Sequence, residues 1–164
     1  MRFLTALLVS ILGGAAGTAV AAGQPTRSAN AEPVSIEPLP AEFVTPGCGC
    51  TFYSTQRPTA DSKVLRWTRA EKTHAIMKLD GEVRWLKLIQ EKRLPTAREH
   101  PRKGDRLVLI FRGENYIVDV PASVVRACWG GARGCSATGY GTRLIVRRGT
   151  DAPRELQGWG ECSC

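Results

Sequence analysis

Six cysteines most strongly constrain what this chain can fold into, because four of them form two short C-x-C elements far apart in the sequence. The first element is Cys48-Gly49-Cys50, and the second is Cys162-Ser163-Cys164. In an extended strand, residues i and i+2 point to the same face. Two such strands lying side by side can therefore form two disulfide bonds on one face of a sheet.

The relative direction of these two strands decides how the cysteines pair. Antiparallel neighbours would give Cys48–Cys164 and Cys50–Cys162, whereas parallel neighbours would give Cys48–Cys162 and Cys50–Cys164. Both arrangements clamp the first and last segments of the folded domain together. The sequence alone leaves the choice between them open.

The other two cysteines, Cys128 and Cys135, would close the glycine-rich segment between them. An even number of cysteines in an exported chain is typical of a disulfide framework, and we predict one that uses all six. The alternative is a thiolate metal site for Zn²⁺ or a soft ion such as Cu(I). Its ligands would be Cys48, Cys50, Cys162 and Cys164. We favour disulfides and expect no cofactor, because C-x-C is shorter than the usual spacing of zinc ligands and an oxidising compartment disfavours free thiols.

The N-terminal segment indicates export to such a compartment. Arg2 is followed by an apolar run over residues 3–12 and by small residues that end at Ala19-Val20-Ala21. This order is typical of a secretory signal peptide, and the apolar run is too short for a membrane-spanning helix. We therefore predict a signal peptide over residues 1–21 and a periplasmic or secreted mature protein.

Proline content distinguishes a linker from a folded domain in the rest of the chain. Five of the ten prolines lie between residues 23 and 46. Proline donates no backbone hydrogen bond and restricts the residue before it, so we predict a disordered linker over residues 22–46. A β-rich globular domain is then expected over residues 47–164.

The expected domain is all-β. Short segments of alternating polarity recur between turn signals, without the regular strand–helix alternation of a parallel α/β fold. We predict a small antiparallel sandwich or a partly open barrel of six to seven strands. The predicted strands cover residues 63–68, 75–79, 83–88, 107–111, 116–120, 142–148 and 154–157.

Turn residues predict the pairing of the first hairpin. Asp80-Gly81 is a strong hairpin signal. A two-residue loop would place Leu79 opposite Glu82, and a three-residue loop would place Leu79 opposite Val83. We prefer the three-residue loop because it gives one continuous apolar face.

Three further expectations concern the segments that follow. Gly113-Glu114 is the predicted turn of a second hairpin, which would place Phe111 opposite Tyr116. Residues 89–106 are expected to form a polar loop. Residues 121–127 are expected to form one helical turn, because proline is favoured at the first position of a helix.

The charge balance points to an anionic partner. The chain has 23 Lys and Arg against 15 Asp and Glu, a net charge of +8. Arginine suits phosphate, sulfate and carboxylate groups because its planar fork donates two parallel hydrogen bonds. The candidate anion-binding residues are Arg93, Arg98, Arg102, Lys103, Arg143 and Arg147. Expected partners are anionic envelope glycans, lipid headgroups or a protein, and export disfavours nucleic acid.

The sequence offers no recognisable catalytic constellation. His74 and His100 are the only histidines, and neither shares a motif with a carboxylate or a free thiol. We expect the four tryptophans to pack in the core, with Trp129 as the best candidate for a binding surface because it adjoins Cys128 outside any patterned strand. These four are Trp67, Trp85, Trp129 and Trp159. We therefore predict an exported, non-enzymatic binding or accessory module of the cell envelope.

Overall fold

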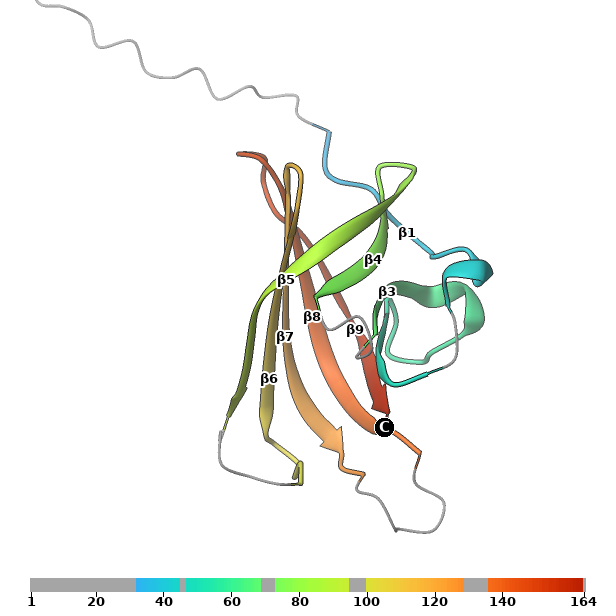
Figure 1. Cartoon of the computed structure of the whole chain (residues 1–164), viewed down its shortest axis with the longest axis vertical. Helices are drawn as coiled ribbons and strands as arrows, with labels where there is room; N and C mark the ends of the chain where they lie inside the picture. The colour runs from blue at the N-terminus through green and yellow to red at the C-terminus, as the bar shows by residue number, and fades with distance from the viewer. Residues whose placement is uncertain (1–31, 45–46, 69–72, 95–99, 129–135, 164) are drawn as a thin grey trace, which may run out of the picture. The chain divides into compact units, whose positions relative to one another are not determined.

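Antiparallel strands and tight turns make up most of the structure, a computed structural model that describes residues 32–44, 47–68, 73–94, 100–128 and 136–163. The strands of the described residues are β1 Ile36–Glu37, β2 Gly49–Tyr53, β3 Lys63–Thr68, β4 His74–Leu79, β5 Glu82–Leu94, β6 Arg106–Gly113, β7 Tyr116–Arg126, β8 Thr138–Arg148 and β9 Arg154–Ser163 (Figure 1). Two 3₁₀ turns, η1 Ala41–Phe43 and η2 Ala60–Ser62, complete the elements. Neither turn has the length to cross a membrane, and the described residues contain no other helix.

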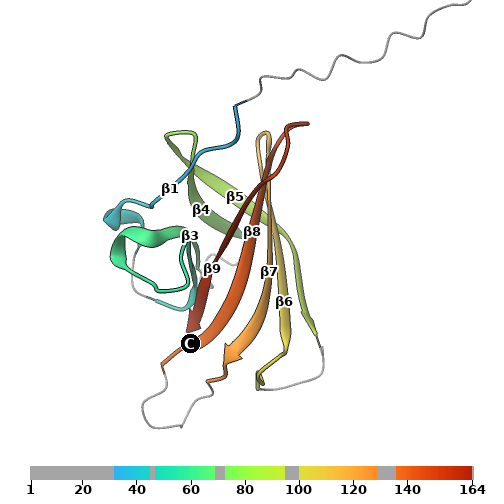
Figure 2. The ribbon, with the colours of Figure 1, turned by 180° about the vertical axis from the view of Figure 1, so that it is seen from behind.

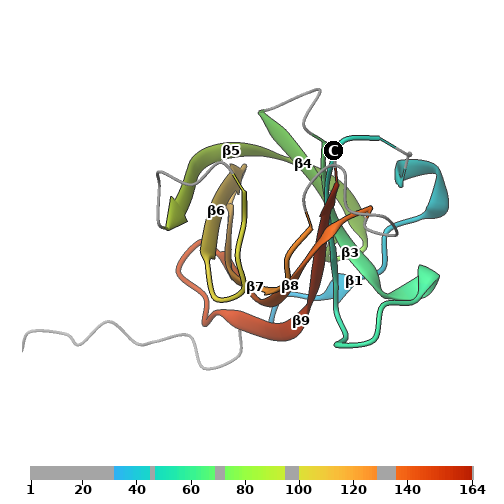
Figure 3. The ribbon, with the colours of Figure 1, turned by 90° about the horizontal axis from the view of Figure 1, so that it is seen from below.

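Eight of these strands close into an antiparallel barrel. Their order is β4-β3-β2-β9-β8-β7-β6-β5, and β5 returns to pair with β4. The ninth, β1, pairs with β4 from outside the ring. Figure 2 shows β9, β8, β7 and β6 from behind, and Figure 3 shows from below that β6 and β3 lie on opposite sides of the domain. The all-β prediction is confirmed, but the barrel is closed and has more strands than expected, and closure leaves fewer strand edges unpaired.

Side chains from alternate strand positions fill the interior of the barrel. Phe111 and Leu109 on β6 are fully buried, as is Phe52 on β2. Trp67 packs edge-on against Phe111 with the ring centroids 6.4 Å apart. A barrel of eight strands has an interior only wide enough for its own side chains or one small ligand, and in this protein large apolar side chains occupy it.

The β4–β5 hairpin has a two-residue loop, so the preferred register with Leu79 opposite Val83 is wrong. Leu79 pairs instead with Glu82. Asp80 and Gly81 both adopt positive φ, 49° and 83°, as in the type I′ turn whose twist matches that of the flanking strands. The turn geometry outweighs the continuous apolar face that the longer loop offered, and Trp85 consequently remains 55% exposed.

The second hairpin also turns one residue later than predicted. Gly113 pairs with Tyr116, and Phe111 lies opposite Val118 rather than opposite Tyr116. The positive φ of 46° falls on Glu114, inside the actual two-residue loop. The shift brings the Tyr116 hydroxyl to the end of the barrel, where it donates a hydrogen bond of 2.7 Å to Asp80.

Two segments expected to lack strands belong to the barrel. Residues 89–94, predicted as part of a polar loop, continue β5 past an irregularity between Leu88 and Gln90. Residues 121–126, predicted as a helical turn, continue β7, because burial keeps alternating through Val120, Ala122 and Val124. Proline has no N–H group, so it is compatible with a strand at a position whose nitrogen donates no hydrogen bond to a neighbouring strand.

The predicted linker over residues 22–46 is ordered in its second half. Val34 and Leu39 are 2% and 6% exposed, and the Leu39 amide donates to the Lys63 carbonyl at 2.7 Å. These apolar side chains hold the segment against the domain despite its prolines. Residues 22–31 and 45–46 lie outside the described part of the chain.

Asp80 joins the turns at one end of the barrel to the segment that leads into β1. Its carboxylate accepts hydrogen bonds from the Ser35 amide at 2.8 Å, the Tyr116 hydroxyl at 2.7 Å and an Arg148 guanidinium nitrogen at 2.9 Å. Arg148 also contacts Asp151 at 2.8 Å. Burial alone would raise the pKa of Asp80, but the three donors outweigh it and hold this pKa below its ordinary value of 3.8.

This depressed pKa predicts an acid-dependent contribution to stability. A carboxyl whose pKa is lower in the folded state stabilises the fold above its unfolded pKa and loses that contribution as the pH falls through the folded value. We expect Asp80→Asn to unfold about 1 kcal/mol more easily at pH 7, with the difference from the parent shrinking below pH 3.8. Urea unfolding at neutral and acid pH measures it, and a difference that grows on acidification would contradict the assignment.

Candidate anion-binding groove

One disulfide bond joins the strands that carry the two C-x-C elements. β2 and β9 are antiparallel neighbours, and Cys50 lies directly opposite Cys162. The two Cα atoms are 4.0 Å apart, and the sulfurs are bonded. This bond confirms the antiparallel alternative for that pair. Cys48 and Cys128 are also disulfide-bonded, whereas Cys135 and Cys164 lie outside the described residues.

The Cys50–Cys162 bond bears directly on the metal alternative. It engages two of the four sulfurs that a thiolate site would need as ligands. The described residues also contain no group of three or more His, Cys, Asp and Glu side chains arranged to hold a metal ion.

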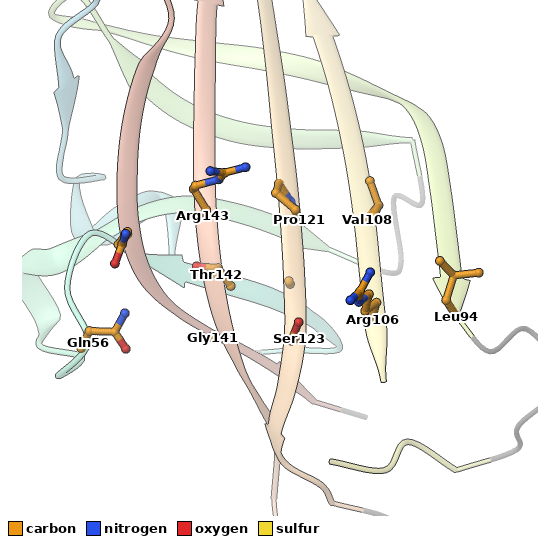
Figure 4. A pocket seen from close by; sticks show the side chains of 11 residues that line it. Gln56, Leu94, Arg106, Val108, Pro121, Ser123, Gly141, Thr142 and Arg143 are labelled. Atoms are coloured by element: carbon orange, nitrogen blue, oxygen red, sulfur yellow. The ribbon is translucent and has the colours of Figure 1, made fainter. Parts of the chain in front are cut away.

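A shallow groove of about 500 Å³ runs across the outer face of the sheet formed by β5–β9. Figure 4 shows Arg143, Pro121 and Val108 side by side on three neighbouring strands, with Arg106 and Ser123 below them. The lining residues are Gln56, Leu94, Arg106, Val108, Pro121, Ala122, Ser123, Gly141, Thr142, Arg143 and Gln157. The groove thus combines two guanidinium groups and two side-chain amides with an apolar floor.

The strand registers explain how these side chains come together. Arg143 on β8 lies opposite Gln157 on β9, and Arg106 on β6 lies between Leu94 and Ser123 on its two neighbours. Directly opposite residues in a sheet share a face. Gln56 belongs to the segment after β2, and its amide donates to the Gly158 carbonyl at 3.3 Å, which places it at the β9 side of the groove.

The two arginines of the groove differ in how far their charge is neutralised. Arg143 has one acidic neighbour, Glu155, at 3.6 Å. Arg106 has no acidic partner among the described residues. A guanidinium without a carboxylate partner retains its capacity for bidentate binding of a phosphate, sulfate or carboxylate group. The amides and Ser123 add donors and acceptors that suit hydroxyl groups.

The predicted anion-binding residues do not gather in this groove. Only Arg143 lines it. Arg147 lies on the same face of β8 but forms an ion pair with Asp119 on β7. Arg93 pairs with Glu91 at 2.8 Å, and its register position places it on the other face of the sheet, opposite Leu107.

The remaining candidates lie beyond the groove. Arg102 and Lys103 are exposed just before β6, where the Arg102 amide donates to Asp105 at 2.8 Å. Arg98 is outside the described residues. Sequence reasoning placed Arg106 in a basic stretch over residues 91–106 but did not select it as an anion-binding candidate. The signal that finds it is the alternation of β6, in which Leu107 faces inward and Arg106 therefore faces outward.

The tryptophans differ in a similar way from the expectation of core packing. Trp67 is 3% exposed and belongs to the core. Trp159 on β9 is partly buried, and the Arg126 guanidinium lies over it, with the guanidinium carbon 5.8 Å from the centroid of the Trp159 ring. Trp85 faces solvent, so the expectation is wrong for this residue. Trp129, the predicted surface candidate, lies outside the described part of the chain.

No protein-family model, curated protein or solved structure matches this chain. The described residues form a disulfide-bonded, closed β-barrel with arginines on its outer face.

Proposed function

We propose that the protein is an exported, non-enzymatic module that binds an anionic partner across the outer face of β5–β8. The observation that carries this proposal is the surplus of positive charge at the outward positions of these strands. The basic residues at these positions are Lys87, Lys92, Arg106, Arg112, Arg143 and Arg147. The acids paired with them are Asp119 and Glu155, which engage Arg147 and Arg143.

The packing of the barrel supports the outer face as the binding surface. Phe52, Phe111 and Leu109 occupy the interior, whereas the groove is open to solvent and has charged and amide side chains along its walls. A partner held by exposed cations approaches with electrostatic attraction that salt weakens. The disulfide bond and the signal-like N-terminus support an oxidising location outside the cytosol.

Charge reversal in the groove tests this function. We expect Arg106→Glu together with Arg143→Glu to weaken binding of dextran sulfate by at least about tenfold, because two attractive contacts become repulsive. The parent affinity should fall steeply between low and high salt, and that of the variant should fall less. Isothermal titration calorimetry at several salt concentrations measures both effects.

A charge-matched control separates the groove from general basicity. Arg93→Glu with Arg102→Glu removes the same charge from positions outside the groove, one of them on the opposite face of the sheet. This control should retain most of the parent affinity. Equal losses in both double variants would show that net charge alone governs binding, and the groove would then have no special role.

A further inference from the structure

Two like charges stand directly opposite each other on the outer face, away from the groove. Lys87 on β5 is the register partner of Arg112 on β6, and both side chains are exposed. Neither has an acidic partner among the described residues. Like charges at opposed positions of an antiparallel pair destabilise it, with the Cβ atoms only about 5 Å apart. An anion between the two side chains would remove this repulsion.

An exposed indole adjoins this pair. Trp85 precedes Lys87 by two positions on β5, so both side chains point outward. The two-residue hairpin loop fixes this orientation, and Trp85 is the most exposed large apolar side chain among the described residues, at 55%. An exposed aromatic ring beside two unpaired cations offers a flat apolar surface and a charged clamp to one ligand.

From this arrangement we propose that Trp85, Lys87 and Arg112 form a second subsite and that the ligand is an acidic polysaccharide. This inference rests on the proposed function and names its ligand class. A sugar ring would pack its C–H face on the indole while its carboxylate or sulfate group lies between the lysine and the arginine. The amides in the groove suit the hydroxyl groups of the same chain.

The spacing of the two subsites favours a polymer over a single ion. Arg112 and Arg106 are both on β6, six residues apart, which is about 20 Å along a strand. Val108 and Ile110 face outward between them and are partly buried. Inorganic phosphate would need only one subsite, and a lipid surface would leave the amides of Gln56 and Gln157 without hydroxyl partners, so an extended chain of acidic sugars fits both subsites.

Trp85→Ala in the full protein tests the subsite with defined oligomers. We expect about tenfold weaker binding of a long oligogalacturonate, because one of two linked subsites loses its platform. Binding of monomeric galacturonate should change little. Val125→Ala, which truncates another exposed apolar side chain on β7, serves as the control and should bind like the parent. Unfolding in urea verifies that both variants fold.

Lys87→Gln adds a signature that a structural role would not give. It should weaken binding of the long oligomer while leaving the urea midpoint unchanged or higher, because it relieves the repulsion with Arg112. A lowered midpoint together with unchanged binding would overturn the subsite.

The outcomes distinguish this inference from the proposed function. If Trp85→Ala binds the oligomer like the parent while the Arg106 and Arg143 double variant does not, the second subsite is wrong and the binding function stands. If neither variant loses affinity, both proposals fail. If inorganic phosphate competed for the site as effectively as the oligomer does, the site would be a simple ion site and the polysaccharide proposal would be wrong. Trp85-dependent binding to phosphatidylglycerol vesicles without oligomer binding would replace the polysaccharide with a lipid surface.

Discussion

Replacing all four cysteines of the C-x-C elements by alanine is expected to lower the free energy of unfolding by about 4–5 kcal/mol. The Cys50–Cys162 bond alone spans 112 residues, and a crosslink over a loop of that length removes much of the entropy of the unfolded chain. The net stability of many domains is only about 5–15 kcal/mol. Urea unfolding of the quadruple variant and the parent, both without reductant, measures the difference.

A double variant shows how much of this stabilisation comes from the Cys50–Cys162 bond alone. If Cys48 pairs with Cys164, as the antiparallel arrangement predicts, Cys50→Ala with Cys162→Ala leaves the ends joined. It should then cost only about 1–2 kcal/mol, from lost packing of a sulfur pair that is mostly buried on the Cys50 side. A double variant as unstable as the quadruple variant would show that Cys48 bonds elsewhere. A quadruple variant as stable as the parent would show that disulfide bonds between the two ends of the domain do not contribute to its stability.

The cysteine pattern predicted a long-range contact because its geometry allows few solutions. Two residues on one face of each strand leave only two arrangements, and hydrogen bonding of β2 to β9 selects the antiparallel one at Cys50 and Cys162. The all-β class was also predictable, since alternation and turn signals act locally. Alternation and turn signals carry no information on how distant strands close the sheet, so closure into a barrel was not predictable.

The errors arose where one local rule competed with another. At Asp80-Gly81 the twist of the type I′ turn prevailed over apolar continuity, and the register moved by one residue. At Pro121 the alternating burial of β7 prevailed over the preference of proline for the first turn of a helix. Periodicity over eight or more residues is the stronger signal, because every second residue contributes to the same buried face.

The candidate site was only partly predictable for the same reason. Charge density along the sequence selected residues such as Arg93 and Arg102, but a surface is formed across strands. Arg106 and Arg143 line the same groove only because β6, β7 and β8 pair in a particular register. The opposed Lys87 and Arg112 likewise become visible only once the irregularity in β5 is known.

Gly158→Ala is expected to lower the free energy of unfolding by about 3 kcal/mol. A Cβ atom on this residue of β9 would overlap the carbonyl oxygen of Tyr53 on β2, with the Tyr53 carbonyl carbon 3.0 Å away. Backbone cannot rotate aside as a flexible side chain can, so β2 and β9 would have to separate. That movement would strain the strand pair that carries the Cys50–Cys162 bond. Thermal and urea unfolding both measure the loss.

Gly141→Ala is the matched control for this prediction, because it makes the same chemical change on the neighbouring strand β8. Its Cβ would meet only a Val125 methyl group, at an ordinary contact distance of 3.6 Å. Alanine also has less conformational entropy to lose than glycine in a strand, so this variant should lie within about 0.5 kcal/mol of the parent or above it. Equal stability of the two variants would show that β2 and β9 can move apart at Gly158 at little cost in free energy. Strands that separate so easily could not hold Cys50 and Cys162 opposite each other before the disulfide bond forms.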